Sequence, residues 1–113
     1  MEIDDRLKKT YEFKRVYKYG NSTADRLIVL YVLKKKNDNM RRVGYSVSKK
    51  IGKAVVRNKV KRLLREVYRN NKDKIESGLD LVIIARKPIV GASYKQIDKS
   101  FNRLLKRSKI LKD

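Results

Sequence analysis

The 113-residue sequence contains no cysteine, no histidine and no tryptophan, and it has one proline and only 12 acidic residues. Without cysteine there is no disulfide bond and no thiolate zinc site. Without histidine there is no imidazole base or ligand and no Ser–His–Asp triad. The few acidic residues form no cluster typical of a magnesium site. We therefore expect no catalytic residue and no metal site in this chain.

Long hydrophobic runs are also missing. The longest, Leu27–Leu33, has seven residues, whereas a membrane helix needs about 20. The first residues, Met1–Asp5, show no apolar signal region. We expect a soluble, cytoplasmic protein with no membrane partner. Leu, Ile, Val and Phe supply 33 of 113 residues, enough for one small core. We therefore expect a single domain over residues 1–113, with frayed ends at 1–9 and 106–113.

Positive charge dominates the composition. Lys and Arg number 32, which gives a net charge of +20. Such a charge on a small domain repels itself and favours a polyanionic partner. A membrane-surface role would need an amphipathic helix whose apolar face is free to insert. Here the apolar faces are required for the core, so nucleic acid is the favoured partner.

Hydrophobic periodicity predicts an α+β fold with one mixed sheet of about four strands packed by helices. The predicted order is α-β-β-α-β-α, with a further short strand possible between Asn21 and Arg26. We expect the first two predicted strands to form a hairpin, and Thr10 to cap the first helix. The elements are a helix over Thr10–Tyr19, strands over Leu27–Leu33 and Val43–Ser48, a helix over about Lys53–Asn70, a strand over Leu79–Ala85, and a last helix opened by a Ser93/Gln96 capping box.

The helix over Lys53–Asn70 carries the strongest functional signal. At 100° per residue six polar residues of this helix fall within an arc of about 140°, opposite an apolar face. A solvated surface helix would normally mix both signs in i,i+4 pairs, but this arc has no acid and is rich in arginine, the residue suited to bidentate phosphate contacts. The arc holds Arg57, Asn58, Lys61, Arg62, Arg65 and Arg69, and Lys49, Lys50 and Lys53 precede it.

Aromatic residues are numerous for so polar a chain, with seven Tyr and two Phe. Exposed rings beside basic residues suit single-stranded nucleic acid, because every base offers a face for stacking. The residues alone leave two interpretations of Phe13, Tyr17 and Tyr31 open: stacking surface or ordinary core. Phe101 is expected in the core.

The segment from Arg42 to Glu66, RVGYSVSKKIGKAVVRNKVKRLLRE, resembles the signature of the bacterial ribonuclease P protein subunit. Phe13 with Tyr17 and Gly20, the Val29–Tyr31 strand, and Asp80 leading to Pro88 resemble that family in order and spacing. The resemblance implies a left-handed β-α-β crossover, which is rare. It also implies that the chain binds a catalytic RNA subunit, and that the complex removes the 5′ leader of precursor tRNA by Mg²⁺-assisted hydrolysis.

The resemblance also implies residue roles. Docking on the RNA subunit falls to Arg57, Asn58, Lys61, Arg62 and Arg65, and the leader cleft maps onto Phe13, Tyr17, Val29 and Tyr31. To the docking residues we add the neighbouring cations Arg69, Lys49, Lys50 and Lys53. Lys59 replaces the arginine at the third position of the family's Arg-Asn-Arg motif, but lies outside the basic arc. The Mg²⁺ is held by the RNA and the substrate. We expect a monomeric protein in a one-to-one complex with the RNA.

Other classes share this charge and size. A non-catalytic structural protein of ribosomal type would bind RNA and process nothing. A self-sufficient nuclease would cleave RNA alone, which the missing histidine and acidic cluster disfavour. A nucleoid-type protein would prefer duplex DNA.

Overall fold

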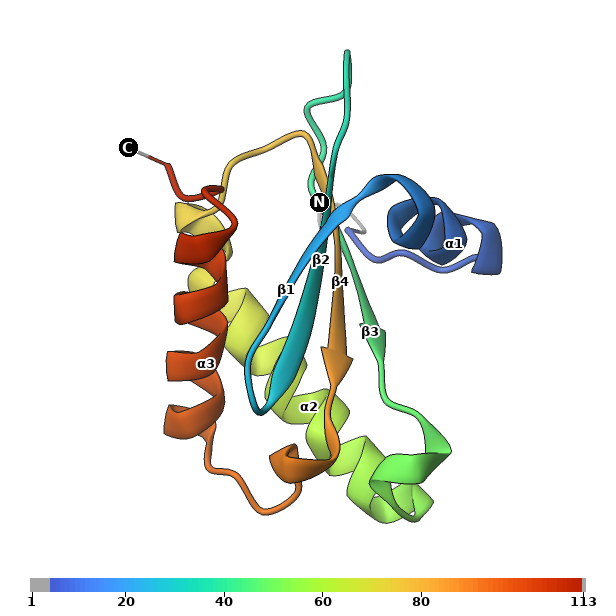
Figure 1. Ribbon diagram of the computed structural model, residues 1–113, viewed down its shortest axis with the longest axis vertical. Helices are drawn as coiled ribbons and strands as arrows, with labels where there is room; N and C mark the ends of the chain where they lie inside the picture. The colour runs from blue at the N-terminus through green and yellow to red at the C-terminus, as the bar shows by residue number, and fades with distance from the viewer. Residues whose placement is uncertain (1–4, 113) are drawn as a thin grey trace.

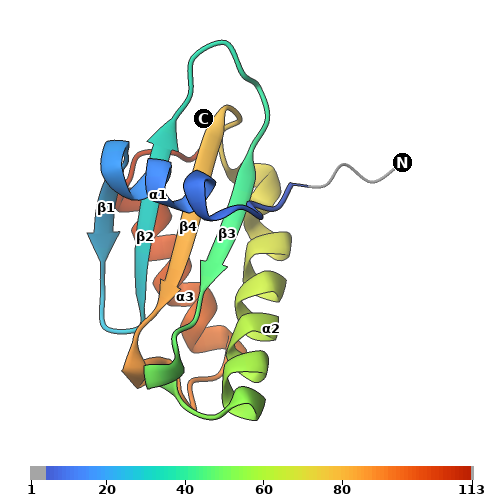
Figure 2. The same cartoon turned by 90° about the vertical axis from the view of Figure 1, so that its right-hand side faces the viewer.

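The computed structural model describes residues 5–112 and consists of one four-stranded sheet with helices on both faces. Helix α1 crosses one face, and α2 and α3 cover the other (Figures 1 and 2). The elements are α1 (Thr10–Tyr19), β1 (Asn21–Ala24), β2 (Ile28–Lys34), β3 (Arg42–Ser46), the 3-10 turn η1 (Lys49–Ile51), α2 (Ala54–Asn71), η2 (Lys72–Lys74), β4 (Leu79–Ala85), η3 (Lys87–Ile89) and α3 (Tyr94–Arg107).

The strand order is β1-β2-β4-β3. This confirms the short extra strand, but the predicted hairpin between the strands now labelled β2 and β3 is wrong. Strand β4 lies between them, antiparallel to β2 and parallel to β3. The reason is burial: Leu79–Ala85 is apolar at six of its seven positions. A strand of that composition is most stable in the middle of a sheet, with both faces covered.

The connection from β3 through α2 to β4 joins two parallel neighbours. In Figure 2, β3 and β4 run in the same direction, β3 lies to the right of β4, and α2 lies on the face away from α1. A crossover with this geometry is left-handed, as the family resemblance implied.

The main core lies between the sheet and helices α2 and α3. Phe101, Leu104 and Leu105 of α3 are fully buried there, as are Ile28 and Leu30 of β2. Phe101 is thus a core residue, as predicted. The capping box of α3 is also confirmed: Ser93 Oγ accepts a hydrogen bond from the Gln96 N–H at 3.2 Å, and Gln96 Oε1 accepts one from the Ser93 N–H at 2.9 Å.

Helix α1 begins at Thr10, but the predicted cap is wrong. Lys9 occupies the N-cap position, and the carboxylate of Glu12 accepts hydrogen bonds from the backbone N–H groups of Lys8 and Lys9 at 3.0 and 2.8 Å. A negative charge at this end of a helix also interacts favourably with the helix dipole.

At both ends expected to fray, described residues contact the rest of the fold. Leu7 is buried, and its N–H donates to the carbonyl of Val43 at 2.9 Å along the edge of β3. At the other end, Ile110 is fully buried, and its carbonyl accepts a hydrogen bond from the Glu76 N–H at 2.8 Å. At each end a single buried apolar residue among charged neighbours packs against the fold. One apolar residue produces no hydrophobic periodicity, so the sequence pattern did not predict these contacts. Residues 1–4 and 113, also expected to fray, lie outside the described part.

Candidate RNA-binding surfaces

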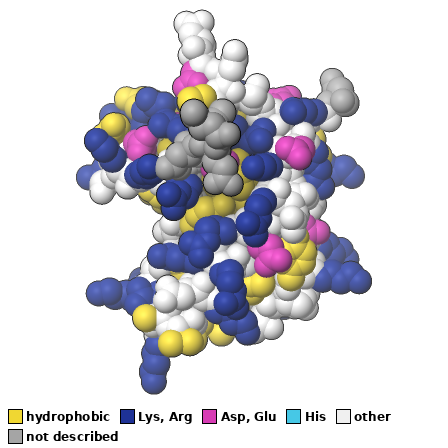
Figure 3. Space-filling model, turned by 180° about the vertical axis from the view of Figure 1, so that it is seen from behind, with side chains coloured by type: hydrophobic (Ala, Val, Ile, Leu, Met, Phe, Trp, Pro, Cys, Tyr) yellow, Lys and Arg dark blue, Asp and Glu magenta, His cyan; other side chains and the backbone are white. Residues whose placement is uncertain are grey.

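Helix α2 presents the predicted basic arc on its outer side. Val60, Leu64 and Val67 face the core, whereas Asn58, Arg62, Arg65 and Arg69 are exposed and Arg57 and Lys61 are half-buried at the margin. These six polar residues are called the basic face below. Figure 3, which views the molecule from the side of β3 and α2, shows Lys and Arg side chains gathered over this region.

Gly52 joins the basic residues before α2 to the helix itself. Its φ of 152° lies in a region that side chains rarely allow, so the turn between η1 and α2 requires glycine. This turn places Lys49, Lys50 and Lys53, all exposed, at the amino end of the basic face. The nine predicted residues thus lie on η1, the turn after it and α2, and seven of them are exposed.

Arg57 stands out within this set. Its Nε atom is buried and finds no hydrogen-bond acceptor among the described residues. A buried donor without an acceptor costs about 1–3 kcal/mol. Because the side chain remains partly exposed, an incoming anion can supply the missing acceptor.

The predicted aromatic residues lie on the opposite face of the sheet. Side chains alternate along strands, so Val29 and Tyr31 of β2 share the α1 side with Val82 and Ile84 of β4. Helix α1 covers Val82 completely, but Val29, Tyr31 and Ile84 remain partly exposed. Phe13 and Tyr17 of α1, with Val29 and Tyr31, are called the aromatic face below.

Phe13 and Tyr31 combine the features of the two interpretations that the sequence left open, core residue and exposed stacking surface. Each packs against the small second core formed by Leu7, Val16 and Val82, yet each stays partly exposed. Phe13 lies so close to Gly44 that a Cβ at that position would be 2.5 Å from its ring. Gly44 is thus needed for the placement of Phe13. The alternation of large and small residues along the strand around Gly44 did not reveal this requirement.

Tyr17 is the most exposed member of the aromatic face, at 39%. Its ring meets that of Tyr31 edge-to-face, with centroids 5.0 Å apart. Burial raises the pKa of Tyr17, and a hydrogen bond with Ser46 opposes that rise. The hydroxyl is therefore neutral at physiological pH and anchors the ring to β3. Tyr11 and Tyr19, at 65% exposure, lie outside this group.

A buried ionic cluster, which the sequence analysis missed, fixes α1 to the sheet. Asp80 of β4 is 0% exposed. Arg42 of β3 donates to its two carboxylate oxygens at 3.0 and 2.9 Å, Lys35 lies 3.0 Å away and Arg15 of α1 3.4 Å away. Arg42 also donates to Glu12 of α1 at 2.6 Å. The sequence feature that could have indicated this cluster is the single acidic residue, Asp80, within the otherwise apolar strand Leu79–Ala85.

This cluster changes the ionisation of its members. Hydrogen bonding to Asp80 raises the pKa of Arg42 above its usual value. The hydrogen bond from the Lys9 backbone is the largest of several effects that lower the pKa of Glu12. Glu12 and Arg42 are therefore charged at neutral pH, and the cluster sets the distance between α1 and the strands. It thereby positions Phe13 and Tyr17.

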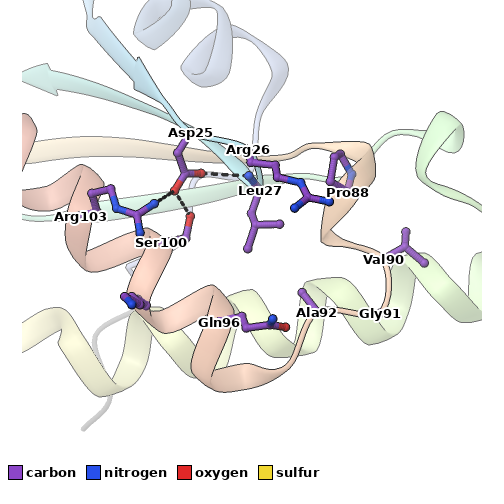
Figure 4. A pocket seen from close by; sticks show the side chains of 11 residues that line it. Asp25, Arg26, Leu27, Pro88, Val90, Gly91, Ala92, Gln96, Ser100 and Arg103 are labelled. Atoms are coloured by element: carbon purple, nitrogen blue, oxygen red, sulfur yellow. Dashed lines mark hydrogen bonds and ion pairs between the residues drawn. The ribbon is translucent and has the colours of Figure 1, made fainter.

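A cavity of about 390 Å³ lies at the other edge of the sheet, beside the turn between β1 and β2 and the start of α3 (Figure 4). Asp25 accepts hydrogen bonds there from Ser100 Oγ at 2.5 Å, Arg103 at 3.1 Å and the Leu27 N–H at 3.0 Å. Burial alone would raise the pKa of Asp25, but these hydrogen bonds bring it below its ordinary value. The carboxylate holds the turn onto α3.

Comparisons with known proteins agree with this geometry. The family model described as Ribonuclease P matches residues 1–109. The ribonuclease P protein component of Clostridioides difficile is 52% identical over 105 residues, covering 92% of this chain and 91% of that relative. The chain belongs to the ribonuclease P protein family.

Solved structures of ribonuclease P proteins share the fold. The Staphylococcus aureus protein superposes with a TM-score of 0.87 at 41% identity, covering 96% of this chain and 98% of that one. The Thermotoga maritima protein gives 0.81 at 34% identity, covering 90% and 96%. Family membership makes this chain an accessory, RNA-binding subunit of an endoribonuclease that matures the 5′ end of tRNA.

Within residues 5–112 of this ribonuclease P protein, no group of three or more acidic side chains is arranged to hold a metal ion. Glu12 and Asp80 approach the same region, but Arg42 bridges them. None of the helices in this part of the chain is long and apolar enough to cross a bilayer.

The ionic cluster gives a direct prediction. Asp80→Asn keeps the size of the side chain but removes the buried counter-charge, so that Arg42 keeps only Glu12 and Lys35 only Asp38 as acidic partners. Breaking a buried ion pair by removing one partner costs about 3–5 kcal/mol, so we expect the free energy of unfolding, measured by urea denaturation, to fall by about that amount. Asp73→Asn, an exposed acid in η2, is the control and should change it by less than about 0.5 kcal/mol. A decrease below about 1 kcal/mol at position 80 would contradict the assigned role.

Proposed function

We propose that the basic face docks this ribonuclease P protein onto the catalytic RNA subunit, while the aromatic face binds the single-stranded 5′ leader of precursor tRNA. The observation that carries the proposal is the pairing of two chemically different surfaces on opposite faces of one rigid sheet. One is rich in guanidinium groups, and the other exposes stackable rings.

The basic face suits a folded RNA. Arg62, Arg65 and Arg69 are exposed on one side of α2, where they can make bidentate contacts to phosphates. The buried Nε of Arg57, which has no acceptor within residues 5–112, adds a donor that is satisfied on binding. Asn58, also exposed, offers both a donor and an acceptor to a base edge or a sugar hydroxyl.

The aromatic face suits an extended strand. Stacking on Tyr17 and Tyr31 tolerates any base, because all bases have a π-face. A leader has no fixed sequence, so this tolerance matches the substrate. Precursor tRNA then binds more tightly than mature tRNA, which lacks the leader, and product leaves the complex.

The chemistry belongs to the RNA in this proposal. The Mg²⁺ ions that assist hydrolysis are held by the catalytic RNA and the substrate, and the protein contributes binding and charge neutralisation. The net charge of +20 lowers the repulsion between the two RNAs. We further propose that one monomeric protein joins one catalytic RNA, and that the complex acts in the cytoplasm, where precursor tRNA is made.

The decisive experiment is a cleavage assay at low Mg²⁺. We expect precursor tRNA to be cut at the mature 5′ end when the protein and a bacterial ribonuclease P RNA are present together. The protein alone should give no cleavage, because the chemistry is assigned to the RNA, and the RNA alone should be slow, because low Mg²⁺ leaves its phosphates poorly screened. If the protein binds the RNA but does not accelerate cleavage, the assigned role is wrong.

The basic face is tested by the salt dependence of RNA binding. We expect the Arg57→Ala/Arg65→Ala double variant to bind the catalytic RNA more weakly. The slope of log affinity against log salt should be shallower by about 0.7–0.9 for each phosphate that is no longer neutralised. Filter binding at several salt concentrations measures this slope. Lys95→Ala, an exposed cation on α3, is the matched control. Equal slopes for the wild type and the double variant would exclude docking through α2.

The aromatic face is tested by comparing two substrates. Tyr17→Ala should weaken the binding of precursor tRNA to the complex by about 5- to 150-fold, the range expected when one stacked base is released, and leave mature tRNA unaffected. Tyr19→Ala removes another exposed ring from the same helix and should change neither. An equal decrease for precursor and mature tRNA would show that Tyr17 does not contact the leader.

A further inference from the structure

A pocket of about 250 Å³ opens between the edge of β3, helix α2 and the segment Asp5–Arg6. Val43 and Tyr45 of β3 and Tyr68 of α2 provide apolar and aromatic lining. The other lining residues are Asp5, Arg6, Arg62, Arg65, Arg69 and Lys72. In Figure 3 this side of the molecule shows apolar surface surrounded by Lys and Arg side chains.

The aromatic lining is held firmly. Tyr68 is only 3% exposed, its hydroxyl accepts a hydrogen bond from Arg41 Nε at 3.0 Å, and Arg41 Nη1 donates to the carbonyl of Ile75 at 2.7 Å. Tyr45 lies on the neighbouring strand and is partly exposed. Burial raises the pKa of both tyrosines, so both hydroxyls are neutral at physiological pH.

The lining residues suit a ligand that is flat on one side and anionic on the other. Phosphate binding alone explains the arginines but not the aromatic and apolar floor. An acidic peptide would match the arginines but does not need a stacking surface. The pocket is open to solvent and has a volume of about 250 Å³, which gives a flat ring room to enter.

We propose that this pocket receives one unpaired nucleobase of the catalytic RNA, stacked on Tyr45, while Arg62, Arg65 and Arg69 bind the phosphates on either side. This inference rests on the proposed docking of α2. It adds a site of different chemistry, because base stacking contributes affinity that does not depend on counterion release. It also gives the docking a preferred register, which phosphate contacts alone do not provide.

The first test compares the salt dependence of two variants in binding to ribonuclease P RNA. Tyr45→Leu keeps an apolar side chain but removes the ring, and we expect affinity to fall about five-fold or more, by the same factor at every salt concentration. Arg65→Ala should instead reduce the salt slope. Tyr45→Phe, which restores the ring, should bind within about two-fold of wild type. Thermal unfolding and the preference for precursor over mature tRNA verify that the Tyr45→Leu fold is intact.

The second test uses the full chain without the catalytic RNA, so it does not depend on the proposed docking. Adenosine 5′-monophosphate and ribose 5-phosphate, at millimolar concentrations, carry the same phosphate but only the first has a base. We expect the nucleotide to shift the ring NMR signals of Tyr45, and the shift to be absent with ribose 5-phosphate and in Tyr45→Leu.

Three results would overturn the base pocket. They are equal shifts with both ligands, no base-dependent shift at Tyr45, and RNA affinity unchanged in Tyr45→Leu. A failure of the docking itself appears separately, as an unchanged salt slope in the Arg57→Ala/Arg65→Ala variant, whereas the nucleotide titration still reports on the pocket.

Discussion

Scarcity of negative charge is the constraint on which the rest of the structure depends. With 12 acids against 32 cations, the buried carboxylates are placed where each neutralises several groups at once. Asp80 joins β4 to β3, α1 and the loop after β2, and Asp25 joins the β1–β2 turn to α3. Helix α2 keeps a single acid, Glu66. The distribution of acids thus holds the fold together and also leaves α2 with six cations and one acid.

The position of β4 separates the two proposed binding surfaces. As the central strand it is buried on both faces, so the sheet has a core on each side rather than one solvated face. The larger core carries α2 and therefore the basic face, and the smaller one carries α1 and the aromatic face. Because both helices pack on the same sheet, the two surfaces keep a fixed relation, so in the proposed complex an RNA docked at one is oriented with respect to a strand bound at the other.

Local features of this fold could be predicted from the sequence, and long-range ones could not. The bounds of α1, β4 and the start of α3 followed from periodicity, a buried run and a capping box, each contained within a few neighbouring residues. The pairing of β2 with β4 rather than β3 depends on which apolar strand gains most from burial, a comparison across the whole chain. The contacts of Asp80 and of Gly44 with Phe13 likewise join residues about 30 or more apart. The basic face was predictable because all of its residues lie on one helix. The pocket between Tyr45 and Tyr68 could not be predicted, because a strand and a helix form it together.

The cost of concentrating charge falls on the binding surface. The buried Nε of Arg57 lacks an acceptor among residues 5–112 of the free protein, and the arginines around the β3–α2 pocket repel one another. Both effects destabilise the unbound state, and phosphates bound as proposed would relieve them, so part of the proposed binding free energy is the release of a penalty already present. Substituting these residues should accordingly harm the isolated fold little and harm binding much. That asymmetry distinguishes the basic face from Asp80, whose partners are all within the protein and whose removal is felt with or without RNA.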